Sequence, residues 1–568
     1  MKQLRYLLYL VLPVIMLASC SHEEPVVPAD VKISKTELEL PHKAIQAQTY
    51  VTIKSDQPWT TMISSDWVSM SFTSGEANKE YNVLIKATNN ENTESREATI
   101  TVNSGSTHAK IHVKQERGSL TVKPEDIPDY NKIYNPSGSE HISLSSDGNW
   151  FFGRSAQSEH FIAFWQPDYG EFGDTTTPSN YPESKYRVDL NALLSWCEEC
   201  YDGYIKTMKF SDEGHSILDV HKINIYITYP PNWADPSAAA YGSGVEDQVG
   251  CLWLNATWAN DKAIVAHEVG HSFQYIVGCD KIYNKETSNV SSMAFRYDVG
   301  QGNGFWEQCA QWMAYMMLPA QTFTAYNFAD YCKATYKHQL HEDTRYSNYF
   351  IHHYMTDKYG IDAVAEIWKA ARAPKDALEV YMAIHDLSVA EFNAQMYEYA
   401  AHAATWDFEG LSTSGLNYVN KISYKSAKGD DGYYKVDASC CPEATGFNVI
   451  RLQNYTKGNE ISIDFVGLPN EPGYNKSGTA TDGGWTIGFV ALSSDNTTRY
   501  YSETAIATSE TDYKTSISWT IPADTRRLWA VVSATPVKYI SHRWDENNSN
   551  DRHWPYKMAV SGATPSNI

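Results

Sequence analysis

The pattern of apolar residues changes along this chain, and this change limits its architecture more than any other sequence feature. Residues 31–115 have a β pattern, and the segments 98–102 (ATITV) and 109–115 (AKIHVKQ) alternate in the two-residue period of half-buried strands. The region 307–408 is almost entirely helical in pattern, whereas short β-patterned segments return in 411–568. We therefore expect a multidomain protein with an N-terminal β-sandwich, a central α+β domain and a C-terminal β-sandwich or jelly roll.

Turn residues and composition place the domain boundaries. A chain of 568 residues is long enough for three or four domains. The stretch after residue 116 is rich in Pro, Gly and Ser, which is typical of a linker. The predicted segments are a signal peptide (1–20), a tether (21–30), a β-sandwich (31–116), a linker (117–130), an α+β domain (131–408) and a C-terminal β-sandwich (411–568).

The N-terminus has the features of an export signal. Lys2 and Arg5 precede an apolar run, 6–18, that is too short to span a bilayer. The run ends in Leu-Ala-Ser-Cys20, which resembles a bacterial lipobox, and the SHEEP that follows resembles the export tag of surface lipoproteins in Bacteroidetes. The resemblance implies lipidation of Cys20 and an outer-membrane lipoprotein exposed at the cell surface and anchored through its lipid. An ordinary cleaved signal of a secreted protein stays open as the alternative.

The charge balance argues against one class of partner. The chain has 46 Lys and Arg against 68 Asp and Glu, which gives a net charge of −22. Such an acidic surface repels nucleic acid and anionic lipid headgroups. We therefore expect no nucleic-acid partner.

The first β region resembles a BACON domain, a small immunoglobulin-like sandwich common in Bacteroidetes lipoproteins. The matching residues are Trp59, Asp66-Trp67-Val68, Gly75, Asn89, Arg96, the ATITV strand and the terminal Val113-Lys114-Gln115. The resemblance implies either contact with glycans or a spacer role, and we favour the spacer because a fold alone does not define a function.

The stretch 263–278 (AIVAHEVGHSFQYIVG) is predicted to be a helix. Asn260 or Asp261 can cap its start, and Gly278 can end it. A strongly apolar strand is predicted at 249–258, directly before this helix.

Two histidines on this helix have the spacing of metal ligands. His267 and His271 are one turn apart and project from the same face, so both imidazoles can reach one Zn²⁺. Glu268 lies beside them, where it can accept a proton from a metal-activated water. This is the HExxH arrangement, although two ligands do not complete a catalytic zinc site.

A third ligand is expected on a second helix. No third histidine follows the motif at metzincin spacing, and Gln274 stands where that pattern has Gly. The helix 303–319 supplies Glu307 beside an apolar stripe that includes Ala310, and Pro319 ends the helix. A carboxylate at an apolar face needs a partner. The partner is either zinc or the cation of a salt bridge.

HEVGH, 35 intervening residues and the Glu of FWEQCAQW together resemble the gluzincin metallopeptidases. The resemblance implies a zincin-like fold for the central α+β domain. It also implies that His267, His271 and Glu307 are zinc ligands and that Glu268 is the general base. In gluzincins the edge of the strand before the motif helix holds the substrate backbone, and 249–258 stands in that place. The block 130–568 also looks like an uncharacterised Bacteroidetes family sometimes labelled avirulence protein.

A second, partial likeness concerns the motif alone. HEVGHSFQ is similar to the HE-x-GH-x-x-Q of enhancin-like, mucin-degrading peptidases, in which the ligand Glu usually lies closer to the motif.

These resemblances imply a zinc-dependent endopeptidase that hydrolyses extracellular proteins or glycoproteins by zinc-activated water. A second donor usually holds the oxyanion. The candidates are Tyr346, Tyr349, His352 and His353, which lie 39–46 residues after Glu307, and the sequence does not choose among them.

Two alternatives to the endopeptidase function stay open. One is a carbohydrate- or glycoprotein-binding surface lipoprotein with a degenerate peptidase domain. The other is a zinc enzyme that acts on a different bond.

Overall fold

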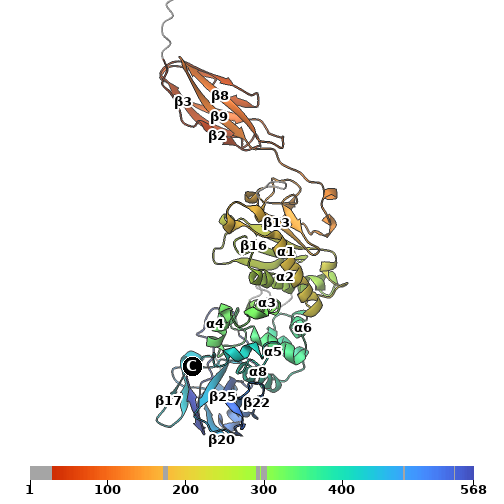
Figure 1. Cartoon of the computed structure of the whole chain (residues 1–568), viewed down its shortest axis with the longest axis vertical. Coiled ribbons are helices and arrows are strands. Elements are labelled where there is room, and N and C mark those ends of the chain that lie inside the picture. Colours follow the sequence, from red (N-terminus) through yellow and green to blue (C-terminus); the bar gives the residue numbers. More distant parts are fainter. Residues whose placement is uncertain are drawn as a thin grey trace, which may run out of the picture. The chain divides into compact units, whose positions relative to one another are not determined.

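The computed structural model describes residues 28–170, 177–288, 295, 303–476, 480–542 and 544–567 (Figure 1). The predicted signal peptide and its Cys20 lie outside the described residues, as does most of the tether. The chain divides into two compact units between Thr121 and Val122, inside the predicted linker.

The first unit is a β-sandwich of two sheets. One sheet has the order β1-β3-β7-β5, and the other has the order β2-β9-β8-β4-β6. Its strands are β1 (Val31–Ile33), β2 (Glu37–Leu40), β3 (Gln48–Ser55), β4 (Trp59–Ile63), β5 (Val68–Met70), β6 (Ser74–Gly75), β7 (Glu80–Ala87), β8 (Arg96–Ser104) and β9 (Thr107–Gln115). The predicted segments 98–102 and 109–115 form the antiparallel pair β8 and β9.

The alternation seen in the sequence places one face of each sheet in a shared core. Ile53 and Ile85 come from one sheet, and Ile100 and Ile111 come from the other, and all four are fully buried. Trp59 is buried as well, and Gly75 lies so close to its ring that a Cβ there would sit 2.5 Å away. This unit therefore has a complete core of its own, as a sandwich of this size requires.

The second unit begins with a five-stranded sheet of order β12-β13-β14-β16-β15. The three middle strands are parallel, and both outer strands are antiparallel to their neighbours. The bounds are β12 (Ser155–Gln157), β13 (Phe161–Trp165), β14 (Ile223–Thr228), β15 (Ala240–Val245) and β16 (Val249–Asn255). A short parallel pair, β10 (Ile142–Ser143) and β11 (Trp150–Phe151), precedes the sheet.

Helices cover this sheet and continue beyond it (Figure 1). Helix α2 packs against α1, β15, β16 and α3. The helices are α1 (Leu190–Asp202), α2 (Lys262–Tyr283), α3 (Asn303–Met317), α4 (Tyr326–Ala334), α5 (Phe350–Tyr359), α6 (Ala363–Ala370), α7 (Ala377–Ile384) and α8 (Val389–Ala403). No helix among the described residues is long and apolar enough to cross a membrane.

Helix α2 is longer than its sequence suggests. We expected it to end at Gly278, but it continues for more than a turn, to Tyr283. A glycine inside a helix costs only about 1 kcal/mol relative to alanine. The turn after Gly278 is held by packing, since Cys279 and Lys281 are both buried.

The C-terminal region is a second β-sandwich. One sheet has the order β17-β18-β26-β20-β24, and the other has the order β22-β21-β25-β19-β27, with β23 also paired to β21. The strands are β17 (Ser426–Lys428), β18 (Tyr434–Val436), β19 (Phe447–Gln453), β20 (Glu460–Gly467), β21 (Gly484–Ser493), β22 (Arg499–Tyr501), β23 (Ala505–Thr508), β24 (Lys514–Thr520), β25 (Thr525–Ala534), β26 (Tyr556–Ser561) and β27 (Thr564–Ser566).

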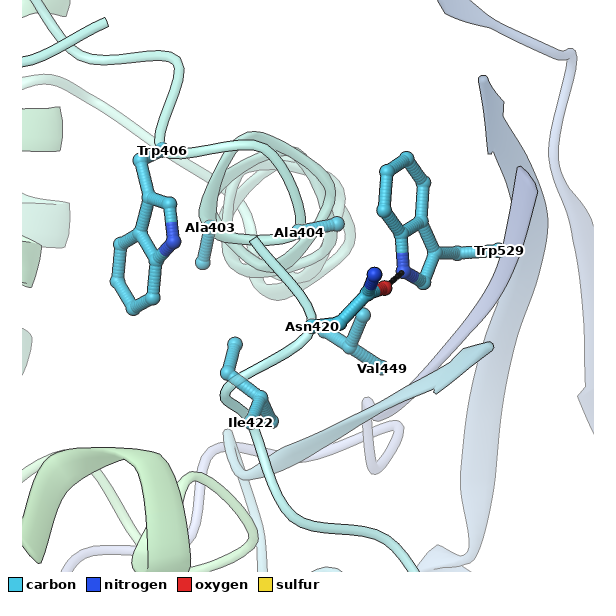
Figure 2. A pocket seen from close by; sticks show the side chains of 7 residues that line it. All are labelled: Ala403, Ala404, Trp406, Asn420, Ile422, Val449 and Trp529. Carbon is cyan, nitrogen blue, oxygen red and sulfur yellow. Dashed lines mark hydrogen bonds between the residues drawn. The ribbon is translucent and has the colours of Figure 1, made fainter. Parts of the chain in front are cut away.

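This sandwich is part of the second unit rather than a separate body. One face of β25 packs against α8, and Figure 2 shows Trp529 there with its indole N–H directed at Asn420. That hydrogen bond measures 2.8 Å. Val449 and Trp529 belong to the same buried cluster as the helices. The predicted boundary near residue 411 therefore separates the helical region from the C-terminal β-sandwich, although the two regions share one core.

Candidate metal centre

Helix α2 fixes the two histidines of the motif. The side chain of Asp261 caps its first turn by accepting hydrogen bonds from the backbone N–H groups of Ala263 (2.9 Å) and Ile264 (3.4 Å). From this start the four-residue spacing places His267 and His271 on one face. Both are buried.

Helix α3 brings Glu307 to the same point. Its Oε2 lies 3.1 Å from Nε2 of His267 and 3.1 Å from Nε2 of His271. The two helices approach closely because Gly270 faces Ala310, where a Cβ on the glycine would lie only 3.3 Å from the Ala310 Cα. All three predicted ligand residues are therefore brought together.

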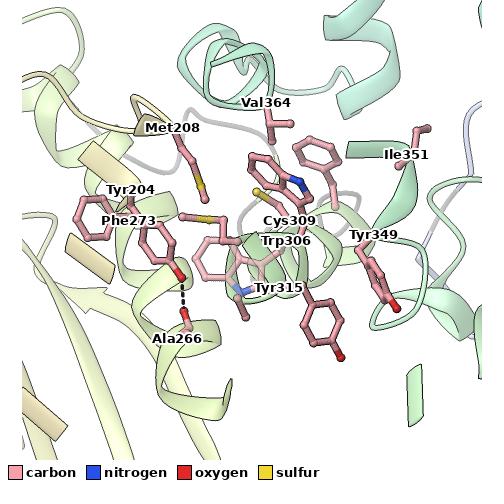
Figure 3. Close-up of a cluster of buried hydrophobic side chains, with 14 of the residues drawn as sticks. Tyr204, Met208, Ala266, Phe273, Trp306, Cys309, Tyr315, Tyr349, Ile351 and Val364 are labelled. Atoms are coloured by element: carbon pink, nitrogen blue, oxygen red, sulfur yellow. Dashed lines mark hydrogen bonds between the residues drawn. The ribbon is translucent and has the colours of Figure 1, made fainter. Parts of the chain in front are cut away.

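Figure 3 shows the buried side chains around this helix pair. Tyr204 donates a hydrogen bond of 2.8 Å to the carbonyl of Ala266, the residue before the first histidine. Trp306, the neighbour of Glu307, lies in the same cluster. The helices that carry the ligands are thus held in rigid core packing, which a preorganised site requires.

The three ligand atoms fit a zinc ion. In tetrahedral zinc sites, bonds of 2.0–2.1 Å place neighbouring ligand atoms about 3.3 Å apart. The observed 3.1 Å separations are close to this value. The imidazole planes of His267 and His271 are perpendicular, with ring centroids 4.6 Å apart, so their Nε2 atoms converge. Two imidazoles and a carboxylate are also a donor set that zinc prefers.

The carboxyl groups of the cluster differ in charge state. Burial raises the pKa of Glu307, but its contacts with His271 and His267 outweigh burial and hold that pKa well below its usual range. Burial raises the pKa of Glu268 to about 7, although the charge of His267 and the backbone of Gly242 act to lower it. Glu307 is therefore ionised, and Glu268 can exchange a proton near neutral pH.

A hydrogen-bond chain sets the orientation of His271. Its Nδ1 donates to the side-chain oxygen of Gln274 (2.9 Å), and the Gln274 amide donates to the carbonyl of Trp306 (3.0 Å). The proton is thereby held on Nδ1, which leaves Nε2 free to bind a metal. The Trp306 ring stacks on the imidazole at 4.8 Å. The sequence placed Gln274 near this face but did not identify its partner.

The strand expected to bind substrate is not at the sheet edge. Residues 249–258 contain β16, but β16 pairs with β14 on one side and β15 on the other. The outer position next to the metal cluster belongs to β15, which the sequence did not reveal because AYGSGV lacks apolar alternation. A Cβ on Gly242 of β15 would lie 2.1 Å from the Glu268 carbonyl, so glycine allows the strand to reach α2.

Among the four candidate oxyanion donors, Tyr346 lies at the cluster. Its ring centroid is 6.0 Å from that of His267. Burial of its hydroxyl raises the pKa of Tyr346, and the carboxylates of Glu307 and Glu268 raise it further. The side chain is nevertheless 38% exposed. Tyr346 thus keeps its proton at neutral pH and lines the approach to the ligands.

The other three candidates lie in the core. Tyr349 is fully buried, and its hydroxyl donates to the carbonyl of Thr322 (2.7 Å). His352 stacks on Phe305 at 5.1 Å, and burial lowers the pKa of both His352 and His353 to about 3. His353 packs against the rings of Trp312 and Phe350, so these side chains lie among neutral groups.

A second group of metal-ligand residues, His341, His542 and Asp551, is also buried, but its geometry differs. The two imidazoles are stacked, with centroids 4.5 Å apart and planes 22° from parallel, so their in-plane lone pairs cannot meet at one ion. Nε2 of His542 bonds Glu342, and Nδ1 lies 3.3 Å from Asp551. An imidazole between two carboxylates is protonated on both nitrogens and has no lone pair for a metal. These residues form an ion-pair network.

The fold and the sequence define a multidomain protein in which an N-terminal β-rich domain precedes an α+β region and a further β-sheet region. The BACON family model matches residues 57–116. A second family model matches residues 125–567, so the chain belongs to a family of unknown function (DUF6055). No match is found among curated proteins.

Solved structures give only distant likenesses. A Bacteroides ovatus GH5 xyloglucanase, in complex with a XXXG heptasaccharide, is 13% identical, with a TM-score of 0.16; the match covers 45% of this chain and 62% of that one. A protein from Bacteroides thetaiotaomicron solved by NMR is 16% identical, with a TM-score of 0.12 and coverage of 17% and 97%. The family 22 carbohydrate-binding module of Clostridium thermocellum Xyn10B is 10% identical, with a TM-score of 0.15 and coverage of 26% and 87%.

Proposed function

We propose that this protein is a zinc-dependent endopeptidase, similar to gluzincins, that cleaves extracellular proteins or glycoproteins. The convergence of His267, His271 and Glu307 supports the proposal most strongly, because three ligand atoms from two helices meet at zinc-like separations. Glu268 is buried beside them, where a general base is needed.

The residues divide the chemistry among them. His267, His271 and Glu307 would hold zinc, which when bound supplies Lewis acidity and makes a water molecule a nucleophile near neutral pH. Glu268 takes the proton of the attacking water and delivers it to the leaving amine; its pKa of about 7 suits both steps.

Two further features would position the substrate. The Tyr346 hydroxyl, which stays protonated, donates a hydrogen bond to the carbonyl oxygen as negative charge develops on it. The outer strand β15 offers backbone N–H and C=O groups to which an extended peptide can add as a further strand.

The cellular setting of the proposal is an outer-membrane lipoprotein at the cell surface, with the BACON domain as a spacer. It is supported by the export signal and by the lipobox at Cys20. Replacing Cys20 by Ser is expected to move the protein from the membrane fraction to the soluble fraction of fractionated cells. Retention in the membrane would contradict the lipid anchor.

Metal analysis of three purified variants tests the function. We expect about one zinc per chain in the wild type and in Glu268→Gln, and little zinc in Glu307→Ala, because the latter loses a ligand. Proteolysis of a panel of proteins and glycoproteins should fall by about 10²–10⁴-fold in Glu268→Gln. Glu286→Gln makes the same change at an exposed site just after α2 and should have no effect.

Two results would contradict this proposal. A wild type that takes up no zinc when zinc is added would favour a glycoprotein- or carbohydrate-binding lipoprotein on a degenerate peptidase scaffold. The second result is a wild type that binds zinc but cleaves no peptide, and that has another hydrolytic activity which Glu268→Gln loses. The zinc would then serve the hydrolysis of a bond other than a peptide bond.

A further inference from the structure

The segment that carries Tyr346 has little regular structure of its own. It connects α4 to α5 and contains only one short 3₁₀ turn, Glu342–Thr344. Side chains hold its backbone instead: Gln308 donates to the carbonyl of Gln339 (2.7 Å), and Asn348 donates to the same oxygen (2.7 Å). Gln308 directly follows the ligand Glu307, so this segment is tied to the metal-bearing helix.

The C-terminal sandwich holds the same segment from the other side. The carboxylate of Glu443 accepts the backbone N–H of His338 (2.8 Å), and the Thr445 hydroxyl accepts that of Gln339 (3.1 Å). Nε2 of His338 bonds the carbonyl of Ile540 (3.0 Å). Burial lowers the pKa of His338 to about 3, so it is neutral and donates this bond.

The strongest tie is the ion-pair network around His542. Its imidazole bonds the carboxylate of Glu342, which also accepts the backbone N–H of Glu546 (2.7 Å). Asp551 lies 3.3 Å from Nδ1 of His542 and 3.2 Å from Nε2 of His341. Glu342 and His542 are 2% and 7% exposed, respectively. Removing one partner from a buried pair leaves an uncompensated charge, so this network fixes its members strongly.

A stack of side chains leads from this network to Tyr346. Arg345 donates from Nη1 to the carbonyl of Glu342 (2.9 Å). Its guanidinium lies 5.0 Å from the Trp544 ring of the C-terminal region and 5.4 Å from the Tyr346 ring. Such contacts between a cation and aromatic rings contribute about 0.5–2 kcal/mol each. Tyr346 is thus linked to the loop that contains both His542 and Trp544.

We propose that His542 is a positioning residue for Tyr346, and that the C-terminal sandwich completes the metal centre by holding the Tyr346 segment in place. The inference rests on the proposed function in that it takes Tyr346 as the oxyanion donor. A donor contributes only when it is held at the place where charge develops, and an error of about 1 Å can cost 10²-fold in rate. The C-terminal region is therefore part of the catalytic unit and differs in role from an appended binding module.

The test replaces His542 by Gln in the full chain, which keeps a polar side chain but removes the positive charge. We expect zinc content to be unchanged, while amide hydrogen exchange across residues 338–348 speeds up by about tenfold or more. The kcat should fall by about 10–100-fold with little change in KM, because Tyr346 acts in the transition state. His553→Gln is the matched control, since His553 is in the same loop and burial lowers its pKa, although Asp551 acts to raise it, so its imidazole does not carry the positive charge that His542 supplies.

A double-mutant cycle separates positioning from general damage. If His542 acts through Tyr346, adding His542→Gln to Tyr346→Phe should lower kcat by less than about threefold further. Full additivity of the two losses, or unchanged exchange across 338–348, would overturn the proposal. His542→Lys, which restores a cation, should recover part of the exchange protection.

A milder variant keeps the test informative where His542→Gln does not fold. Trp544→Ala leaves the buried ion pairs in place and removes the stack on Arg345. It should speed exchange at 345–348 and lower kcat, while zinc stays bound. The exchange measurement needs no substrate. A wild type without peptidase activity would therefore refute the proposed function, whereas the exchange rates would still test whether His542 holds the Tyr346 segment.

Discussion

At the scale of single residues, orientation distinguishes the metal cluster from the other buried histidines. The rings of His267 and His271 are perpendicular, and their Nε2 atoms converge on one oxygen of Glu307. The rings of His341 and His542 are stacked instead. Both groups consist of the same residue types at similar depth. The direction of the lone pairs therefore makes the first group the candidate metal site and the second an ion-pair network.

The role of Gln274 gives a prediction at this scale. Gln274→Ala removes the acceptor for the Nδ1–H of His271, so zinc affinity should fall by about 10–100-fold. Competition with a zinc chelator measures this change. Gln274→Glu keeps the acceptor but loses the amide that donates to the Trp306 carbonyl, so its zinc affinity should lie between those of the wild type and Gln274→Ala. An unchanged affinity in Gln274→Ala would show that the hydrogen bond does not support the ligand.

At the scale of elements, the close approach of β15 to α2 shapes the site. Gly242 and Gly244 have no room for a side chain, because a Cβ would lie 2.1 Å from the Glu268 carbonyl and 2.1 Å from the Tyr275 ring, respectively. The strand can therefore lie against the motif helix only with glycine at these positions. This requirement explains why its sequence does not resemble a strand.

Gly242→Ala tests this packing. The added methyl group must push β15 away from Glu268 and His271, so we expect a loss of about 1–3 kcal/mol in the free energy of unfolding, together with weaker zinc binding. Thermal unfolding with and without a chelator measures both effects. Gly138→Ala is the control, because a Cβ there has only Glu140 nearby at 3.8 Å, and its effect should be within about 0.5 kcal/mol. Equal stability of the two variants would contradict the packing argument.

At the scale of the whole molecule, the second unit joins three kinds of structure in one body. The helices and the C-terminal sandwich share a core around Trp529, and the His542 network adds buried charge at the same junction. Burial lowers the pKa of His542, but Asp551 and Glu342 outweigh it and raise that pKa to about 9. The rings of His338 and His341 also face it, at 5.4 and 4.5 Å.

The raised pKa predicts a pH dependence of stability. His542 binds its proton more tightly in the folded chain than in the unfolded chain, where its pKa is about 6.5. Its contribution is therefore fully present below about pH 6.5 and is lost as the pH rises to about 9. The loss is on the order of 3 kcal/mol.

Thermal unfolding of the wild type and of His542→Gln between pH 6 and 9.5 measures this effect. The wild type should lose stability across the window, and the variant should show a much smaller slope. His385→Gln is the control, since burial lowers the pKa of His385, so its contribution to stability changes with pH in the opposite direction to that of His542. A wild-type slope that persists in His542→Gln would assign the pH dependence to other groups.

Local sequence patterns determined much of this protein. Two-residue alternation predicted β8 and β9, because each of these strands has one buried face, and apolar segments between turn residues predicted C-terminal strands. The spacing of His267 and His271 and the apolar stripe beside Glu307 predicted which residues meet, since helical periodicity fixes side-chain direction along one helix. The order of a β-sandwich, an α+β region and a second β-sandwich also followed from the sequence.

Contacts between distant segments decided the rest. The sequence did not reveal the outer strand β15, the bond from Gln274 to His271, the extension of α2 past Gly278, or which of the four candidate donors faces the ligands. Each depends on packing against residues far away in the chain. The segment of Tyr346 is bonded through Glu342 to His542, which lies 196 positions after Tyr346 in the chain. Sequence periodicity describes one element at a time, and only the tertiary structure brings such partners together.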